Sequence, residues 1–277
     1  MTAARAVGAT PPGPGRPQPM TRGELVGLTA VGFGALLLVW LLATWTGLTS
    51  SQFLPSPLEV GRTFAQLTRE PFAGFTLQAH LLSSFGRFFL GFSLAVVVGI
   101  PLGLLMGWFR WIDDVVSPLF EALRFVAPLA WVPFAALWFG TGIGGPILVI
   151  FTGAFPPCVI NAYRGARFVE LRFIEAAQTL GASHFRMIAD VLIPGSLPSL
   201  VAGLRVSAGL AWQSLVGAEL IVVGSGIGYV MVQGQSNLAP AIVMSGMIAI
   251  GIVGVVIDVL LRAVERRVRR RWGGLPA

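Results

Sequence analysis

The feature that most limits how this chain can fold is a series of long apolar stretches with almost no charged residues. Each is close to the roughly 20 residues that a helix needs to cross about 30 Å of hydrocarbon. Charged residues make up only 11% of the chain, whereas an average soluble domain has about 25%. We therefore predict an all-α polytopic membrane protein with six transmembrane helices. The expected spans are Leu25–Thr46, Phe88–Trp108, Val115–Phe139, Gly145–Tyr163, Leu200–Val223 and Pro240–Leu261.

The 19 basic residues are all arginines, and their distribution predicts which side of the membrane each loop faces. Six spans put both termini on one side. If that side is the cytoplasm, 14 arginines fall in cytoplasmic segments and three fall outside, at Arg62, Arg69 and Arg87. The remaining two, Arg124 and Arg205, fall within spans. Cytoplasmic loops of membrane proteins are enriched in Arg and Lys. We therefore expect both termini in the cytoplasm and a positive charge that reflects topology rather than nucleic-acid binding.

The chain contains no lysine and one cysteine, which limits the chemistry it can carry. The phosphate-binding loop of nucleotide-hydrolysing proteins needs a Gly-Lys-Ser/Thr ending, because the Lys reaches the β- and γ-phosphates. Cys158, His80 and His184 are too few and too scattered for a His/Cys zinc site. We expect no catalytic residue, metal or cofactor on this chain.

Composition divides the chain into four parts. Residues 1–22, rich in Pro and Gly, are expected to form a disordered cytoplasmic tail. Residues 23–79 should hold the first transmembrane helix and a periplasmic amphipathic segment, where a capping box at Ser56–Glu59 predicts a short helix. Residues 80–265 are the expected core with five transmembrane helices, and residues 266–277 form a basic cytoplasmic tail.

The loop at about residues 164–199 is predicted to form two short helices outside the membrane. Helix-forming residues run from Glu170 to Leu180, and Gly181 follows where helix ends favour positive φ. Ser183 can cap the second helix. Two prolines are expected to break the chain before the next span, Pro194 and Pro198. Spacing alone is equally compatible with an ordinary amphipathic loop.

This loop carries a recognisable motif. Glu175-Ala176-Ala177 is followed by Gly181 and then by Val191-Leu192-Ile193-Pro194, which resembles the EAA signature of ABC importer permeases. Residues 80–265 are similar to the nitrate/sulfonate/taurine branch of that family. The matching stretches include Ser83–Arg87, Gly99–Gly103, Pro128–Pro133, Leu137–Gly140, Gly203–Arg205, Ala218–Leu220 and Gly226–Tyr229.

The resemblance implies a type I ABC importer permease fold, a multi-pass location in the bacterial inner membrane, and a transport subunit rather than an enzyme. Its expected partners are a second permease copy, two cytoplasmic ATPase subunits that bind ATP and magnesium, an external substrate-binding protein, and the surrounding lipid. The EAA loop would dock on the ATPase. The residues implied in this coupling are Glu175, Ala176, Ala177, Gly181 and Ala182. The implied substrate is a small oxyanion such as an aliphatic sulfonate, taurine or nitrate.

Two other classes of function are considered. A secondary transporter driven by an ion gradient often shows internal repeats and ion-binding groups at mid-membrane, but the two halves of this chain show no convincing repeat. An intramembrane enzyme would need a metal set or a Ser/His pair, and no plausible set is present in adjacent spans. An ATP-driven importer therefore remains the favoured prediction, with the secondary transporter as the alternative.

Ionisable residues within apolar spans face a partner or a water-filled cavity by default. Glu121 and Arg124 are three residues apart, so they share a helix face and can pair with each other. Because they lie early in the span, a structural or gating ion pair is favoured over a substrate site. Arg205 and Glu219 are too far apart to pair within one helix, and Glu219 is expected either to make an interhelical contact or to line the pathway. Asp258 is expected to pair with Arg262, four residues on.

Aromatic and small residues complete the expectations for the spans. Beside two prolines lies an aromatic face that consists of Trp131, Phe134, Trp138 and Phe139. It could form a gate or line the translocation pathway, or it could serve helix packing. Glycines at four-residue spacing, Gly99, Gly103 and Gly107, predict close helix packing. The Gly224-x-Gly226-x-Gly228 segment follows a span rather than a strand, so it is interpreted as a turn and not as a dinucleotide-binding loop.

Overall fold

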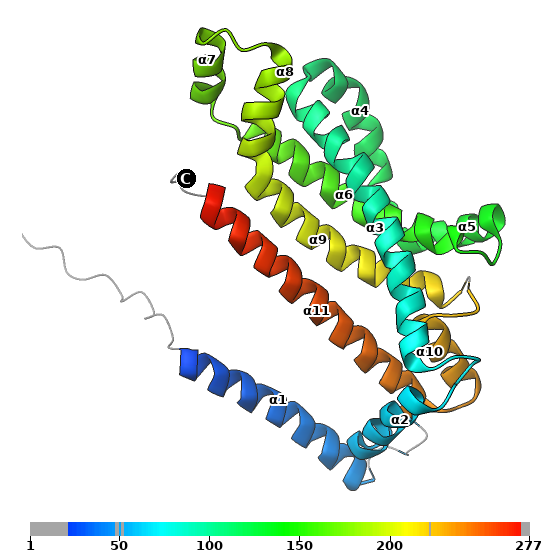
Figure 1. Ribbon diagram of the computed structural model, residues 1–277. Coiled ribbons are helices and arrows are strands. Elements are labelled where there is room, and N and C mark those ends of the chain that lie inside the picture. The colour runs from blue at the N-terminus through cyan, green and yellow to red at the C-terminus, as the bar shows by residue number, and fades with distance from the viewer. Residues whose placement is uncertain (1–21, 48–49, 51–52, 222, 273–277) are drawn as a thin grey trace, which may run out of the picture. The chain divides into compact units, whose positions relative to one another are not determined.

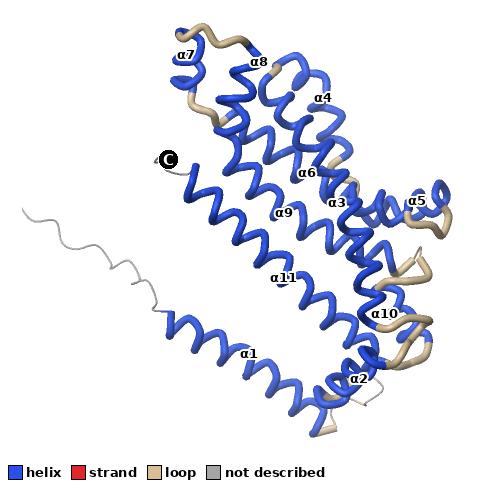
Figure 2. Tube along the Cα trace, in the orientation of Figure 1, coloured by secondary structure: helices blue, strands red, loops and turns tan. Residues whose placement is uncertain are grey.

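The computed structural model describes residues 22–47, 50, 53–221 and 223–272, and all regular elements in these ranges are helices (Figure 2). The predicted tail at residues 1–22 and the last residues of the 266–277 segment fall almost entirely outside them. The chain divides into two compact units, Met1–Pro57 and Leu58–Ala277. In the first unit, α1 (Arg22–Trp45) is long and apolar enough to cross a membrane, as predicted.

The second unit is built on four long helices: α3 (Leu77–Trp108), α6 (Gly144–Arg167), α9 (Ile193–Glu219) and α11 (Pro240–Trp272). They pack in series, α3 on α6, α6 on α9 and α9 on α11 (Figure 1). Phe88, Ile150 and Trp212 belong to a buried cluster where α3, α6 and α9 meet. The Trp212 indole also donates a hydrogen bond of 3.1 Å to the Ile250 carbonyl, which ties α9 to α11.

Glycines allow α3 to approach α6 closely, as predicted. A Cβ atom added at Gly99 would lie 2.9 Å from Cβ of Cys158, and one at Gly103 would lie 2.7 Å from Cβ of Ala162. Helices pack this tightly in membranes because small residues bring many backbone atoms into van der Waals contact.

Gly103→Ala is expected to lower the free energy of unfolding by about 1–3 kcal/mol, the usual cost of overpacking a tight contact. The added methyl group meets α6 backbone and Ala162, neither of which can rotate away. Gly86→Ala on the same helix is the matched control, because no atom lies within 4 Å of its added Cβ. Thermal unfolding of the two purified variants in detergent measures their stability. Equal melting temperatures for the two variants would contradict this account of the helix contact.

The predicted third span, Val115–Phe139, is wrong as a single helix. The chain forms α4 (Arg110–Leu123), a short 3₁₀ segment η1 (Pro128–Trp131) and α5 (Val132–Phe139), with a bend of 85° between the two halves. Proline disfavours helical geometry in the residue before it, and Ala127 before Pro128 has φ −57° and ψ 139°. The described residues therefore contain five helices able to span a membrane, or six if this bent pair counts as one.

Two prolines do not break the chain where predicted. Pro194 and Pro198 lie within α9, which continues directly from α8 (His184–Arg186) and a π-helical segment η2 (Met187–Leu192). Pro194 lies inside this continuous helix, at the junction between η2 and α9. Within membranes, neighbouring helices can satisfy backbone groups that proline leaves free. The second short helix of the loop is therefore the beginning of a long one.

Shorter elements complete the second unit. The predicted amphipathic helix is present as α2 (Pro57–Arg69). The second span is longer than predicted, because α3 begins at Leu77 rather than Phe88. The fifth ends earlier, at Glu219, and the glycine turn after it leads into α10 (Ile227–Ser236), which was not predicted. Helix α11 continues through most of the basic segment to Trp272.

Candidate functional site

The EAA segment forms a separate short helix with a defined end. Helix α7 (Leu171–Thr179) is followed by Gly181, whose φ is +75° as expected. The Gly181 amide donates to the Gln178 carbonyl at 2.9 Å, and the Ala182 amide donates to the Ala177 carbonyl at 3.0 Å. This pair of bonds is the Schellman arrangement, which satisfies carbonyls at a helix end and requires the positive φ that glycine adopts easily. The Ser183 hydroxyl then accepts a bond from the Arg186 amide, as predicted.

None of the residues of α7 is buried. Glu175, Ala176 and Gly181 are exposed, and Ala177 and Ala182 are half-buried. Large apolar side chains beside them are exposed too, with 87% of Leu180 and 79% of Phe185 accessible. A cavity of about 770 Å³ lies between α7 and the helices η2 and α9, with Ala176, Ala177, Leu180 and Pro194 in its walls. The five predicted coupling residues thus lie together around one exposed apolar turn.

A buried polar cluster connects α3, the end of α9 and the start of α10. The Arg87 guanidinium and the Glu219 carboxylate form an ion pair of 2.8 Å, with only 1% of the Glu219 side chain exposed. Glu219 also accepts bonds from the Ser84 hydroxyl at 2.8 Å and from the Gly228 amide at 3.1 Å. Arg87 further donates to the carbonyl and the hydroxyl of Ser225. Of the two roles predicted for Glu219, the structure shows the interhelical contact.

His80 extends this cluster and fixes the same turn. Its Nδ1 atom accepts a hydrogen bond of 3.0 Å from the Gly226 amide. Because Nδ1 is an acceptor, the proton of the neutral ring is on Nε2, which lies 3.0 Å from the Phe72 carbonyl. The Ile227 amide donates to the Ser84 hydroxyl at 3.0 Å. The glycine turn is therefore held by three side chains of α3.

The prediction that Arg87 belongs to an outer loop is wrong. Arg87 lies within α3 and is only 8% exposed. The cost of burying its charge is offset by the ion pair with Glu219 and the hydrogen bond to Ser225. His80, Ser84 and Arg87 follow one another at intervals of four and three residues, which places them on one helix face. This polar stripe is a signal in the sequence that could have identified the cluster.

Glu121 and Arg124 form the predicted pair, with Nη2 of Arg124 2.7 Å from the Glu121 carboxylate. Both side chains are partly exposed. A second polar group near it was not predicted: Asp113 of α4 accepts bonds from the Tyr163 hydroxyl and from Arg167 of α6, each 2.9 Å long. This group joins the first turn of α4 to the last turn of α6, next to the loop that carries α7.

Arg205, in the middle of α9, and Asp258 of α11 connect these two helices. Arg205 donates to Asp258 at 2.7 Å and to Glu265 at 3.3 Å, so its partners are on α11. Asp258 also pairs with Arg262 at 2.6 Å, as predicted. One carboxylate therefore serves both an intrahelical and an interhelical pair.

The predicted aromatic face lies on η1 and α5. Ring centroids are 6.0 Å apart for Trp131 and Phe134, 4.2 Å for Phe134 and Trp138, and 6.4 Å for Trp138 and Phe139. Trp138 is 66% exposed and Phe134 39%. The rings form a continuous row in which Trp131 is half-buried and the other three are exposed. Their role in a pathway or gate stays a prediction.

The fold and the exposed EAA turn define a polytopic permease of the ABC importer class. The chain belongs to the family of binding-protein-dependent transport system inner membrane components, whose family model matches residues 99–270. It is 36% identical over 240 residues to the taurine transport system permease protein TauC of Escherichia coli (strain K12), covering 86% of this chain and 87% of that protein. It is 34% identical over 242 residues to the nitrate import permease protein NrtB of Synechocystis sp. (strain PCC 6803 / Kazusa), covering 85% and 86%.

Among solved structures, an inward-facing form of the MetNI methionine ABC transporter shares the fold. The TM-score is 0.63 at 19% identity, over 69% of this chain and 95% of the solved chain. The predictions of an importer permease fold, of a multi-pass inner-membrane protein and of a transport subunit rather than an enzyme are confirmed.

Proposed function

We propose that this chain is the translocation subunit of an ATP-driven, binding-protein-dependent importer that works by alternating access. Two copies would form the pathway, and two separate ATPase subunits would bind ATP and magnesium and supply the energy. An external binding protein would deliver the solute. ATP-driven closure of the ATPases would move the α7 segments and turn the pathway outward, and hydrolysis would reset it.

The exposed apolar turn at α7 is the observation that carries this proposal. Leu171, Leu180 and Phe185 are each more than 60% accessible, and they surround the Glu175–Ala177 triplet. Exposed apolar side chains clustered outside the apolar spans are typical of a protein–protein interface. Arg164, Arg167 and Arg172 flank the same turn, so the positive-inside rule favours a cytoplasmic position, where an ATPase would be available.

We propose a small oxyanion of the sulfonate, taurine or nitrate type as the solute. The support comes from the relatives, which are named for taurine and nitrate transport and align with more than four-fifths of this chain. With α7 on the cytoplasmic side, as proposed above, both chain termini would lie in the cytoplasm as well.

Uptake by the complete importer in proteoliposomes is expected to require ATP inside and the binding protein outside. Collapsing the proton and sodium gradients with ionophores should leave the initial rate unchanged, because no ion flow is coupled to transport. Radiolabelled taurine, nitrate and sulfonates serve as test solutes. Uptake that persists without ATP but stops when the gradients collapse would contradict the proposal and support a secondary transporter.

A further inference from the structure

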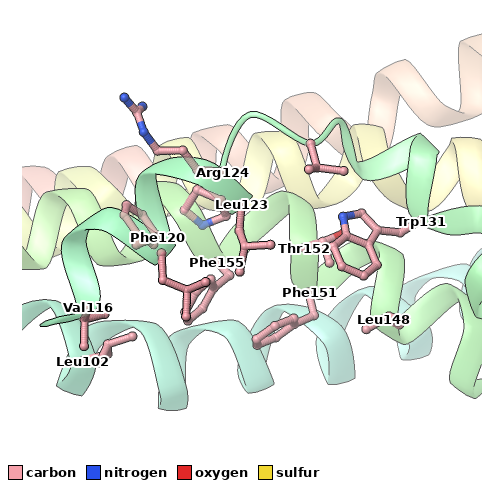
Figure 3. Close-up of a pocket in the computed structure, with 13 residues that line it drawn as sticks. Leu102, Val116, Phe120, Leu123, Arg124, Trp131, Leu148, Phe151, Thr152 and Phe155 are labelled. Carbon is pink, nitrogen blue, oxygen red and sulfur yellow. The ribbon is translucent and has the colours of Figure 1, made fainter.

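Two cavities of the second unit share part of their walls near the bend between α4 and α5. The first has a volume of about 350 Å³ and lies among α3, α4, η1 and α6 (Figure 3). Its walls are almost entirely apolar and include Val116, Phe120, Trp131, Phe151 and Phe155. Apart from the Trp131 indole, only Arg124 and Thr152 bring polar groups, and the Thr152 hydroxyl already donates to the Val149 carbonyl.

The second cavity, about 330 Å³, is more polar. Its walls include Ser117, Glu121, Tyr163 and Arg164, and it shares Phe120 and Arg124 with the first cavity. Figure 3 shows the guanidinium of Arg124 directed away from the aromatic rings of the first cavity. The side chain of Arg124 therefore lies at the boundary between an apolar space and a polar one.

Arg124 retains a donor for a further ligand. Its Nε and Nη2 atoms both bond to the same oxygen, Oε2 of Glu121, at 2.7 Å each. No residue within the described ranges accepts a hydrogen bond from Nη1. The Arg124 side chain is 31% exposed and lines both cavities.

Positive charge exceeds negative charge around the two cavities. The charged side chains in their walls are Arg124, Arg164 and Glu121. Arg164 forms no ion pair with a residue that the structure describes. Asp113, whose hydrogen-bond partners Ser117 and Tyr163 line the second cavity, is neutralised by Arg167 at 2.9 Å. A ligand with one negative charge would balance the site.

We propose that these cavities form a solute-passage site for a small organic anion, which rests on the importer function proposed above. Arg124 would bind the anionic head group, and the apolar cavity would hold the hydrocarbon body. An inorganic oxyanion would lose hydration in the apolar cavity without gaining hydrogen bonds there, whereas a hydrocarbon gains from leaving water. The site therefore favours an alkyl anion, such as a sulfonate, over nitrate.

The first test compares three charge variants in the complete importer, reconstituted with its ATPase and binding protein. Arg124→Gln is expected to reduce butanesulfonate uptake about tenfold, because one charged hydrogen bond to the solute is lost. Glu121→Gln should keep or raise uptake, since it removes the negative charge that competes with the solute for the Arg124 guanidinium. Arg110→Gln, at an exposed arginine of the same helix, is the matched control and should change uptake less than about twofold.

These variants separate a solute contact from a structural role. If Arg124 only holds the helix through Glu121, then Glu121→Gln must reproduce the loss seen in Arg124→Gln, and the proposal is wrong. Equal uptake by Arg124→Gln and Arg110→Gln would also overturn it while leaving the importer function intact. Failure of the unmodified importer to transport any sulfonate, taurine or nitrate would overturn the function and the site together.

The second test fills the apolar cavity. Leu148→Trp is expected to lower butanesulfonate uptake relative to methanesulfonate uptake by about tenfold, because the two solutes share a head group and differ only in hydrocarbon volume. Leu94→Trp, at an exposed position of α3 outside both cavities, is the control and should leave the ratio unchanged. An equal loss of both solutes in Leu148→Trp, as expected if lipid or a second copy occupies the cavity, would contradict the proposal.

Discussion

Glu219→Ala is expected to destabilise the protein by about 3–5 kcal/mol, the cost of leaving a buried charge without its partner. The variant removes the carboxylate from Arg87, which is only 8% exposed and 2.8 Å away. It also leaves the Ser84 hydroxyl and the Gly228 amide without their acceptor. Glu219→Gln retains an acceptor oxygen and a similar volume, so a smaller loss is expected. Unfolding of the purified protein in mixed detergent micelles measures both variants.

The exposed ion pair of the same chain provides the control. Glu121→Ala breaks a pair of similar length, 2.7 Å, but its side chains are 31% and 52% exposed. Exposed pairs contribute at most about 1 kcal/mol. A loss in Glu219→Ala no larger than in Glu121→Ala would show that the buried cluster does not fix the turn between α9 and α10.

Glu175→Lys is expected to reduce uptake at least about tenfold, since reversing a charge within an interface costs several kcal/mol of binding. Membrane insertion and thermal stability of the chain should be unchanged. Glu175 is exposed and forms no hydrogen bond or ion pair with any described residue. The change therefore affects a partner rather than this chain. Co-purification of the ATPase and binding-protein-stimulated ATP hydrolysis should fall with uptake.

Asp114→Lys makes the same charge change at another exposed acidic residue, on α4, and should leave uptake within about twofold of the unmodified importer. Equal uptake by the Glu175→Lys and Asp114→Lys variants would show that α7 is not part of the ATPase interface.

Gly181→Val tests the geometry of the same turn. No atom lies within 4 Å of an added Cβ at Gly181, so any effect must come from the backbone, whose φ is +75°. Holding a branched residue in that conformation costs about 1–3 kcal/mol, and the end of α7 should fray. We expect uncoupled ATP hydrolysis with reduced uptake. Gly181→Asn, which tolerates this φ better, should retain more transport, and equal loss in both variants would contradict the backbone explanation.

Most membrane helices could be predicted from the sequence because length and hydropathy are local properties. Helices α3, α6 and α11 include the predicted spans, and α1 includes all of its predicted span except Thr46. The prediction failed between Val115 and Phe139, where the apolar composition continues but Pro128 forces Ala127 out of helical geometry and the chain bends by 85°. It failed in the opposite direction at Pro194, where the helix continues without a break from η2 into α9. Hydropathy does not distinguish these two outcomes.

The sequence by itself determined the membrane class, the family and the turn at Gly181, since each depends on residues close together in the chain. Only the tertiary structure decided the pairing of Arg87 with Glu219, 132 residues apart, and the position of Arg124 between two cavities. The physical reason is that a buried charge is stable only where another helix brings its counter-charge. The separation between a buried charge and its counter-charge is set by how α3, α4, α6 and α9 pack together. The sequence of one segment does not contain that information.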